Sequence, residues 1–139
     1  MSAMNTASMG PESSVWVMAD RLLVKVTCGT DDPERANQGL TVAAAAVAAG
    51  ATVSLWLTGE GAFFAASGER RTSDLGLEHA TAAGALVDAV LAGGTVTLCT
   101  QCAARRGIGE ADVLAGVRVA GAAAFVEEAL AEGTQALVY

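Results

Sequence analysis

Aromatic and basic residues are scarce in this chain of 139 residues. Phenylalanine, tyrosine and tryptophan make up 4% of the sequence, which argues against a surface that stacks nucleobases. The formal net charge of -7 disfavours polyanionic partners, because contacts with phosphates supply most of the affinity for nucleic acids. The same charge repels an anionic membrane surface. We therefore expect neither nucleic acid nor membrane among the partners.

Long apolar runs are absent as well. None approaches the roughly 20 residues that a membrane-spanning helix needs. The first residues have neither the basic region nor the continuous apolar stretch of a secretory signal. The three cysteines are an odd number, which fits free thiols in a reducing compartment better than a disulfide framework. These features predict a cytoplasmic protein.

The sequence also offers little that would hold a metal or a cofactor. With a single histidine, His79, a Cys/His zinc site would have to recruit distant ligands, and we expect no metal. His79 is expected to be a surface or capping residue at the start of a helix. The segment Thr27–Thr30 stands where a flavodoxin-like fold binds a flavin phosphate, but Asp31 and Asp32 beside it disfavour an anion. We expect no cofactor.

Apolar runs of strand length alternate with alanine-rich helical stretches from residue 21 onward. Strands are predicted over residues 22–27, 52–57, 95–99, 117–119 and 135–138, and helices over residues 33–49, 75–91 and 120–131, with a short helix near residue 102. This alternation predicts a single α/β domain over residues 21–139, a three-layer sandwich with a mostly parallel, flavodoxin-like sheet of about five strands. Residues 1–20 lack periodicity and are expected to form a flexible leader.

The predicted topology gathers several chemical groups at one edge of the sheet. In open α/β sheets, binding sites form outside the carboxyl ends of the strands. Cys28 follows the first predicted strand and Cys99 ends the third. The irregular segment 59–74 follows the second strand and is a candidate lid or subunit contact. All three are expected at the same edge.

The motif Cys99-Thr-Gln-Cys102, followed by Arg105 and Arg106, is the strongest candidate for chemistry. A thiol near arginines loses its proton more easily, and the thiolate is the reactive form. We predict Cys99 as a nucleophile or sulfur carrier and Cys102 as a resolving or second carrier thiol. Arg105 and Arg106 are predicted to favour the thiolate and to bind an anionic sulfur group. The alternative is that Cys99 is a small core residue at a strand end.

Other interpretations of this motif need features that the sequence lacks. The spacing from Cys99 to Arg105 matches the C-x5-R phosphate loop of phosphatases, but the five residues between them contain no glycine for close approach to a phosphate. A thioredoxin motif follows an early strand, whereas this one lies near residue 100. The phosphatase-like enzyme is kept as a lesser alternative.

Three segments of the chain, in this order and spacing, resemble one protein family. They are Gly29–Ala36, Val53–Gly61 and the stretch Cys99–Ile108, which contains the two cysteines and the Arg-Arg-Gly sequence. Together they look like the DsrE/DsrF family, which includes TusD-type sulfur relay proteins and YchN-like proteins. The similarity covers about Leu22–Tyr139.

The resemblance implies a DsrE-like fold, a homo-oligomer (commonly a trimer or hexamer) and a cysteine that carries sulfur as a persulfide. The carrier position of the relay proteins maps onto Cys99, and many YchN-like relatives have a second cysteine where Cys102 stands. No family motif assigns a role to Cys28. The implied function is a small sulfur-carrier protein with donor and acceptor proteins as partners, a possible sulfurtransferase. The alternative is an oligomeric redox sensor or scaffold of the same fold without transfer activity.

Overall fold

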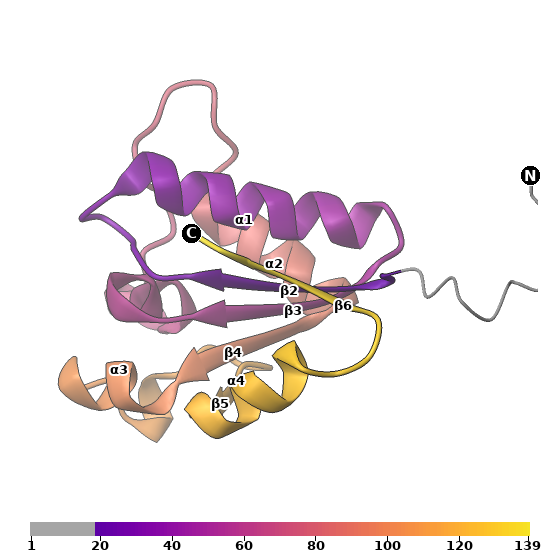
Figure 1. Cartoon of the computed structure of the whole chain (residues 1–139). Helices are drawn as coiled ribbons and strands as arrows, with labels where there is room; N and C mark the ends of the chain where they lie inside the picture. Colours follow the sequence, from indigo (N-terminus) through magenta and orange to yellow (C-terminus); the bar gives the residue numbers. More distant parts are fainter. Residues whose placement is uncertain (1–18) are drawn as a thin grey trace, which may run out of the picture.

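Five parallel strands form the centre of the protein (Figure 1). The computed structural model describes residues 19–139, so the leader predicted over residues 1–20 lies almost wholly outside the described residues. The strands are β2 (Arg21–Val26), β3 (Thr52–Leu57), β4 (Thr95–Cys99), β5 (Arg118–Ala120) and β6 (Thr134–Val138). The α-helices are α1 (Pro33–Ala48), α2 (Ala83–Gly93), α3 (Thr100–Arg105) and α4 (Ala122–Ala129), and 3₁₀ helices η2 (Gly59–Ala65), η3 (Gly68–Arg70) and η4 (Glu110–Asp112) lie between them.

The strand order is β5-β4-β3-β2-β6, and every neighbouring pair is parallel. Helices α1 and α2 cover one face of the sheet, and α4 lies on the opposite face (Figure 1). This arrangement confirms the predicted three-layer α/β fold with a parallel sheet of five strands. Because the strands are parallel, their carboxyl ends meet at one edge, where α3 and η2 follow β4 and β3 directly.

The main core lies between the sheet and helices α1 and α2. Its largest fully buried side chains on the strands and helices of this layer are Leu40, Leu55, Leu57, Leu98, Val24, Val26, Val53, Val87 and Val90. Burying a valine or leucine side chain contributes about 1.5–3 kcal/mol. The small residues of α1 let the helix approach the sheet closely, since a Cβ at Gly39 would lie 2.6 Å from Cγ2 of Val26. Asp32 caps this helix through a hydrogen bond from the Arg35 amide to its side chain.

A polar cluster ties α4 to the opposite face of the sheet. The Glu128 carboxylate accepts hydrogen bonds from the Ser54 hydroxyl (2.6 Å), the Trp56 indole N–H (3.0 Å) and the Arg118 guanidinium. Burial opposes ionisation of this carboxyl, but these donors outweigh it and lower the pKa of Glu128. One turn earlier, the Phe125 ring packs edge-on against Trp56 at 5.3 Å between centroids. Helix α4 is thereby fixed at a defined place over β3.

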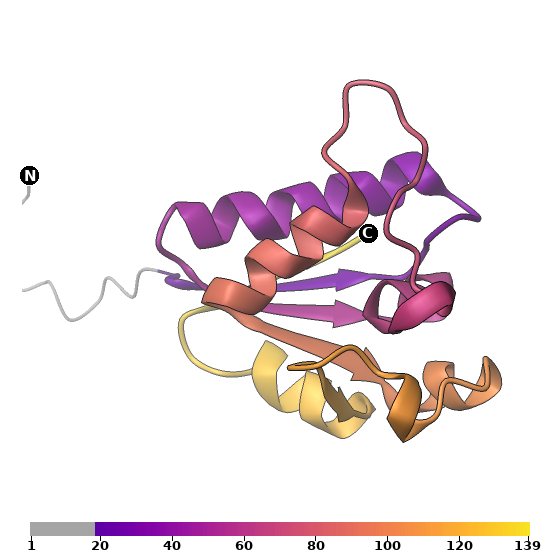
Figure 2. The same cartoon turned by 180° about the vertical axis from the view of Figure 1, so that it is seen from behind.

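The prediction of a helix over residues 75–91 was wrong for the first half of this range. The structure has a loop over residues 71–82, and α2 begins only at Ala83 (Figure 2). The Asp74 side chain accepts a hydrogen bond from the Gly76 amide, and Gly76 and His79 have positive φ angles of 69° and 59°. This local turn competes with helix formation. His79 therefore lies exposed in a loop and does not open a helix.

Candidate functional site

Cys99 is the last residue of β4, and α3 begins at the next residue. The strand before it is fully buried at Val96, Thr97 and Leu98, so the position of Cys99 is fixed by the core. Its own side chain is half-buried. The sequence therefore delivers a partly accessible thiol to the carboxyl edge of the sheet, where the predicted topology placed it.

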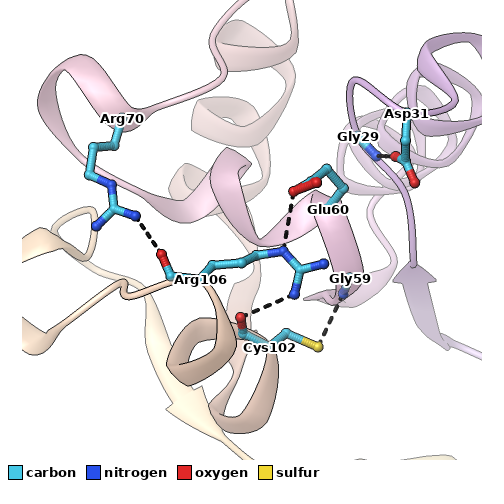
Figure 3. A network of polar contacts seen from close by, with 7 residues as sticks. All are labelled: Gly29, Asp31, Gly59, Glu60, Arg70, Cys102 and Arg106. Atoms are coloured by element: carbon cyan, nitrogen blue, oxygen red, sulfur yellow. Dashed lines mark hydrogen bonds and ion pairs between the residues drawn. The ribbon is translucent and has the colours of Figure 1, made fainter.

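Cys102 lies in the first turn of α3 and links that helix to η2. Its Sγ accepts a hydrogen bond from the Gly59 amide at 3.1 Å (Figure 3). Gly59 follows β3 with a left-handed φ of 55°, and a Cβ there would lie 2.3 Å from the carbonyl oxygen of Thr27. Only glycine fits this position without backbone movement. The second thiol is thus held by a neighbouring strand-end loop.

The surroundings of Cys99 favour its thiolate. Burial raises the pKa of this thiol, but hydrogen bonds from the Cys102 amide, the Cys102 thiol and the Gln101 amide lower it, and the charge of Lys25 lowers it further. The net effect is a pKa below the ordinary value for cysteine. Because the thiolate is the nucleophile, Cys99 has the chemical character of a reactive thiol.

The arginines are placed differently from the prediction. The Nε of Arg106 lies 3.2 Å from the Glu60 carboxylate, and its Nη1 donates to the Cys102 carbonyl at 3.3 Å (Figure 3). Arg105, at the end of α3, is exposed and makes no hydrogen bond or ion pair within residues 19–139. The charge that lowers the pKa of Cys99 is that of Lys25, and neither arginine is among the causes. That Arg105 and Arg106 bind an anionic sulfur group stays a prediction. Arg106 instead fastens α3 to η2.

A second arginine supports the same junction. Arg70 donates from its guanidinium to the carbonyl oxygens of Arg106 (2.5 Å) and Gly107 (2.6 Å), which close the end of α3. It also lies over the Phe63 ring of η2, 5.8 Å from the centroid. The segment after β3 therefore holds the helix that carries Cys102. It is a support for the site in the folded chain.

Cys28 stands apart from the other two thiols in its environment. It is 5% exposed and belongs to the core cluster on the α1 side of the sheet. Burial raises the pKa of Cys28, and the carboxylates of Asp32 and Asp31 raise it further against the opposing charge of Arg35. A buried neutral thiol is inert, so the structure gives Cys28 a packing role.

A pocket of about 340 Å³ opens beside Cys99, between the sheet and the start of α4. Its lining consists of Cys99, Thr100, Gln101, Lys25, Trp56, Thr58, Gly121, Ala122 and Phe125. Sequence reasoning missed Lys25 as a site residue. Trp56 is 1% exposed and borders this pocket from within the core. The signal for Lys25 was a single cation inside the apolar run of the first strand.

The fold and the position of Cys99 agree with what the resemblance to the DsrE/DsrF family implies, and comparison with known proteins establishes the family. A family model for the DsrE/DsrF-like family matches residues 20–139. The chain belongs to the DsrE/DsrF-like family. The search of curated proteins found no match.

Two solved structures share the fold of this DsrE/DsrF-like protein. The ychN protein from E. coli superposes with a TM-score of 0.69 at 17% identity, over 88% of this chain and 100% of that one. MTH1491 from Methanobacterium thermoautotrophicum, described as a protein of unknown function, has a TM-score of 0.60 at 15% identity, over 86% of this chain and 98% of that one. At these identities the likeness establishes the fold.

The geometry of this DsrE/DsrF-like site disfavours the phosphatase alternative. The residues between Cys99 and Arg105 form helix α3, whereas a phosphate cradle needs a loop whose amides converge on one point. Arg105 is at the exposed far end of that helix. Within residues 19–139 no group of three metal-ligating side chains comes together. None of the helices there is long and apolar enough to span a membrane.

The lowered pKa of Cys99 predicts selective alkylation. The thiolate fraction rises with pH, so a thiol with a lowered pKa reacts at lower pH than an ordinary one. We expect iodoacetamide to label Cys99 with a midpoint below the value of about 8.5 for an ordinary cysteine, and Cys28 only at higher pH. Peptide mass spectrometry over a pH series measures both. Lys25→Gln should raise the Cys99 midpoint, and an equal rise in Arg105→Gln would contradict the assignment to Lys25.

Proposed function

We propose that this DsrE/DsrF-like protein is a sulfur carrier in which Cys99 holds sulfane sulfur as a persulfide. The observation that carries the proposal is the position of the Cys99 thiol, half-buried at a strand end, opening on a pocket and followed one helical turn later by a second half-buried thiol, Cys102. The membership of a family that contains sulfur relay proteins supports it. Structural thiols such as Cys28 have none of these features.

The chemistry of loading needs no group beyond the donor. The Cys99 thiolate attacks the terminal sulfur of a donor persulfide, R–S–SH, forming Cys99–S–SH and releasing the thiolate R–S⁻. The amides of Gln101 and Cys102 and the charge of Lys25, which stabilise the thiolate, are placed to stabilise the persulfide anion in the same way. Transfer to an acceptor thiolate is the same displacement in reverse.

Cys102 gives the carrier a second possible outcome. In thiolate form it attacks the inner sulfur of the Cys99 persulfide, which forms a Cys99–Cys102 disulfide and releases hydrosulfide. In the reduced protein its sulfur accepts the hydrogen bond from the Gly59 amide, and Cys102 lies in the first turn of the helix that begins directly after Cys99. We propose Cys102 as the resolving thiol.

Cyanolysis tests the proposal. Cyanide removes the outer sulfur of a persulfide as thiocyanate and regenerates the thiolate, so thiocyanate counts the carried sulfur. After loading with an excess of an organic persulfide and removal of the donor, we expect close to one thiocyanate per Cys102→Ser chain, and a smaller amount from the wild type because Cys102 resolves part of its persulfide. Protein treated with iodoacetamide before loading is the control and should release none. Equal release from both samples would show that the sulfur is not held on a thiol.

The placement of Cys99 and Cys102 three residues apart, at a strand end and in the first turn of the next helix, also favours a second candidate function, a dithiol redox sensor without transfer activity. A sensor would form the Cys99–Cys102 disulfide reversibly with a mild oxidant and take up no sulfur from a persulfide. Loading followed by cyanolysis separates the two functions. We further propose a reducing compartment, the cytoplasm, as the location, since all three cysteines are free thiols in this fold.

Exposed apolar side chains on α4 lead us to propose a homo-oligomer. Val126 on α4 is 51% exposed, and Leu130, which caps the end of this helix four residues later, is 81% exposed, so both side chains lie on one side of it. We expect the wild-type chain to sediment as more than a monomer and Leu130→Asp to lower its mass in sedimentation velocity. Glu127→Gln, an exposed change on the same helix, is the control. A monomeric wild type would overturn this proposal.

A further inference from the structure

The pocket beside Cys99 combines one positive charge with apolar walls. Lys25 is the only cation among its lining residues, and Phe125 and Ala122 supply carbon surface, with the buried Trp56 behind them. Thr58, Thr100 and Gln101 add polar groups around Cys99. A pocket of this composition suits a molecule that has a negative group and a small apolar body.

The placement of Lys25 keeps its charge available. Its ammonium lies 4.9 Å from the centroid of the Phe125 ring, so the aromatic face supports the cation without neutralising it. Within residues 19–139 Lys25 forms no ion pair with a carboxylate. The chain has a net charge of -7, so an unpaired lysine beside a reactive thiol makes the local electrostatic potential positive where the rest of the protein is negative. It gives an anion a favourable place close to Cys99.

The wall opposite the sheet is held in place by the Glu128 cluster. Phe125 contacts Trp56, and Trp56 donates to Glu128, which also accepts from Ser54 and Arg118. Arg118, the nearest cation on this face, is thereby committed to Glu128 and to the Thr97 hydroxyl at 2.9 Å. Arg21, also on this face, is four residues before Lys25 at the other end of β2. Lys25 is therefore the cation left to bind a ligand beside Cys99.

From this arrangement we propose that the Cys99 pocket binds a low-molecular-weight organic persulfide that bears a carboxylate, with Lys25 binding the carboxylate and Phe125 and Ala122 enclosing its carbon chain. The inference rests on the proposed sulfur-carrier function and specifies the donor. A volume of about 340 Å³ matches roughly ten water molecules at about 30 Å³ each, which suits a compact small molecule. Inorganic thiosulfate carries charge but has no apolar part for these walls.

The reaction is a balanced displacement. The Cys99 thiolate attacks the terminal sulfur of ⁻OOC–R–S–SH, the S–S bond of the donor breaks, and ⁻OOC–R–S⁻ leaves while Cys99–S–SH forms. No external oxidant or reductant is required. Lys25 does not take part in bond making; it binds the donor carboxylate and lowers the energy of the anionic sulfur groups by its charge.

Charged methanethiosulfonates test the pocket independently of sulfur transfer. Each transfers a labelled thiol to a thiolate and releases methanesulfinate, and peptide mass spectrometry reads the label at Cys99. Because of the charge of Lys25, we expect Cys99 to react faster with the anionic sulfonatoethyl reagent, relative to the cationic trimethylammonium-ethyl reagent, than it would without this lysine. Lys25→Gln should lower this anion-to-cation rate ratio about tenfold, the order expected for a partly screened charge, and Lys25→Arg should retain it. The neutral methyl reagent corrects for the altered thiolate fraction.

Arg21→Gln is the matched control. Arg21 is on the same strand and the same face of the sheet as Lys25, four residues away, or about 13 Å at the rise of a strand. The Arg21→Gln substitution should leave the anion-to-cation rate ratio unchanged. A ratio unaffected by Lys25→Gln, or lowered equally by Arg21→Gln, would overturn the assignment of Lys25.

The second arm uses true donors on the full chain. 3-Mercaptopropionate persulfide should load Cys99 faster than cysteamine persulfide, which has similar size and the opposite charge, and this preference should disappear in Lys25→Gln. Faster loading by thiosulfate, or loading only by a persulfidated protein, would overturn the donor class. If no donor loads Cys99 while the reagent ratio depends on Lys25, the anion pocket stands and the sulfur-carrier function fails.

Discussion

The Cys99→Ser variant is expected to lose sulfur uptake completely, while Cys102→Ser retains it. Cys99 is the thiol that opens on the pocket and whose pKa is lowered, whereas Cys102 supports it from α3. A serine hydroxyl at position 99 is a far weaker nucleophile than a thiolate at neutral pH. Intact mass spectrometry after exposure to an organic persulfide should show the mass of one added sulfur in wild type and Cys102→Ser, and none in Cys99→Ser.

The Cys102→Ser variant adds a second readout. Without the resolving thiol, the Cys99 persulfide cannot form the internal disulfide, so we expect it to persist longer after the donor is removed. Release of hydrosulfide measures this decay. Cys28→Ala is the control for a cysteine with a packing role and should leave uptake unchanged. Uptake retained in Cys99→Ser and lost in Cys102→Ser would exchange the roles assigned to the two thiols.

Gly59→Ala is expected to be strongly destabilising and to displace Cys102. The added Cβ would lie 2.3 Å from the Thr27 carbonyl oxygen at a position with a left-handed φ of 55°. Left-handed strain and the backbone overlap together cost about 4 kcal/mol of unfolding free energy. Because the Gly59 amide donates to the Cys102 sulfur, the shift also breaks that bond. Urea denaturation measures the free energy, and alkylation of Cys102 reports the displacement.

Gly68→Ala separates strain from overlap. Gly68 has a similar φ of 63°, but nothing lies within 4 Å of a Cβ at this exposed position. We expect a loss of only about 1 kcal/mol, the lower end of the cost of a left-handed residue. Equal losses for the two variants would mean that the Thr27 contact does not constrain the junction of β3 and η2.

The elements predicted most accurately are those with strong local signals. Residues 52–57 and 95–99 form strands with the predicted bounds, because apolar residues and threonines, which favour strands, stand there between glycines and turns. Helix α1 begins at Pro33 as predicted, since the capping residue and the proline at the first position both favour that start. The placement of Cys99 at the carboxyl edge followed from these elements.

The features that sequence reasoning missed depend on contacts between distant segments. Arg106 pairs with Glu60, 46 residues earlier, so its charge is used at the helix–loop junction. Lys25 enters the site because α4 packs over the end of β2, where Phe125 meets its ammonium. Neither pairing has a local signature. The loop over residues 71–82 was missed because the turn at Asp74 outweighs the helical periodicity of the apolar residues.

The most direct test of the account is to locate the sulfur in the wild-type protein, with all three cysteines in competition. The chain is loaded at neutral pH with a limiting amount of 3-mercaptopropionate persulfide, alkylated, digested and mapped by mass spectrometry. The account predicts the added sulfur on Cys99, with Cys28 unmodified. Sulfur found mainly on Cys28 or Cys102, or on no cysteine while Cys99 is free and reduced, would contradict it.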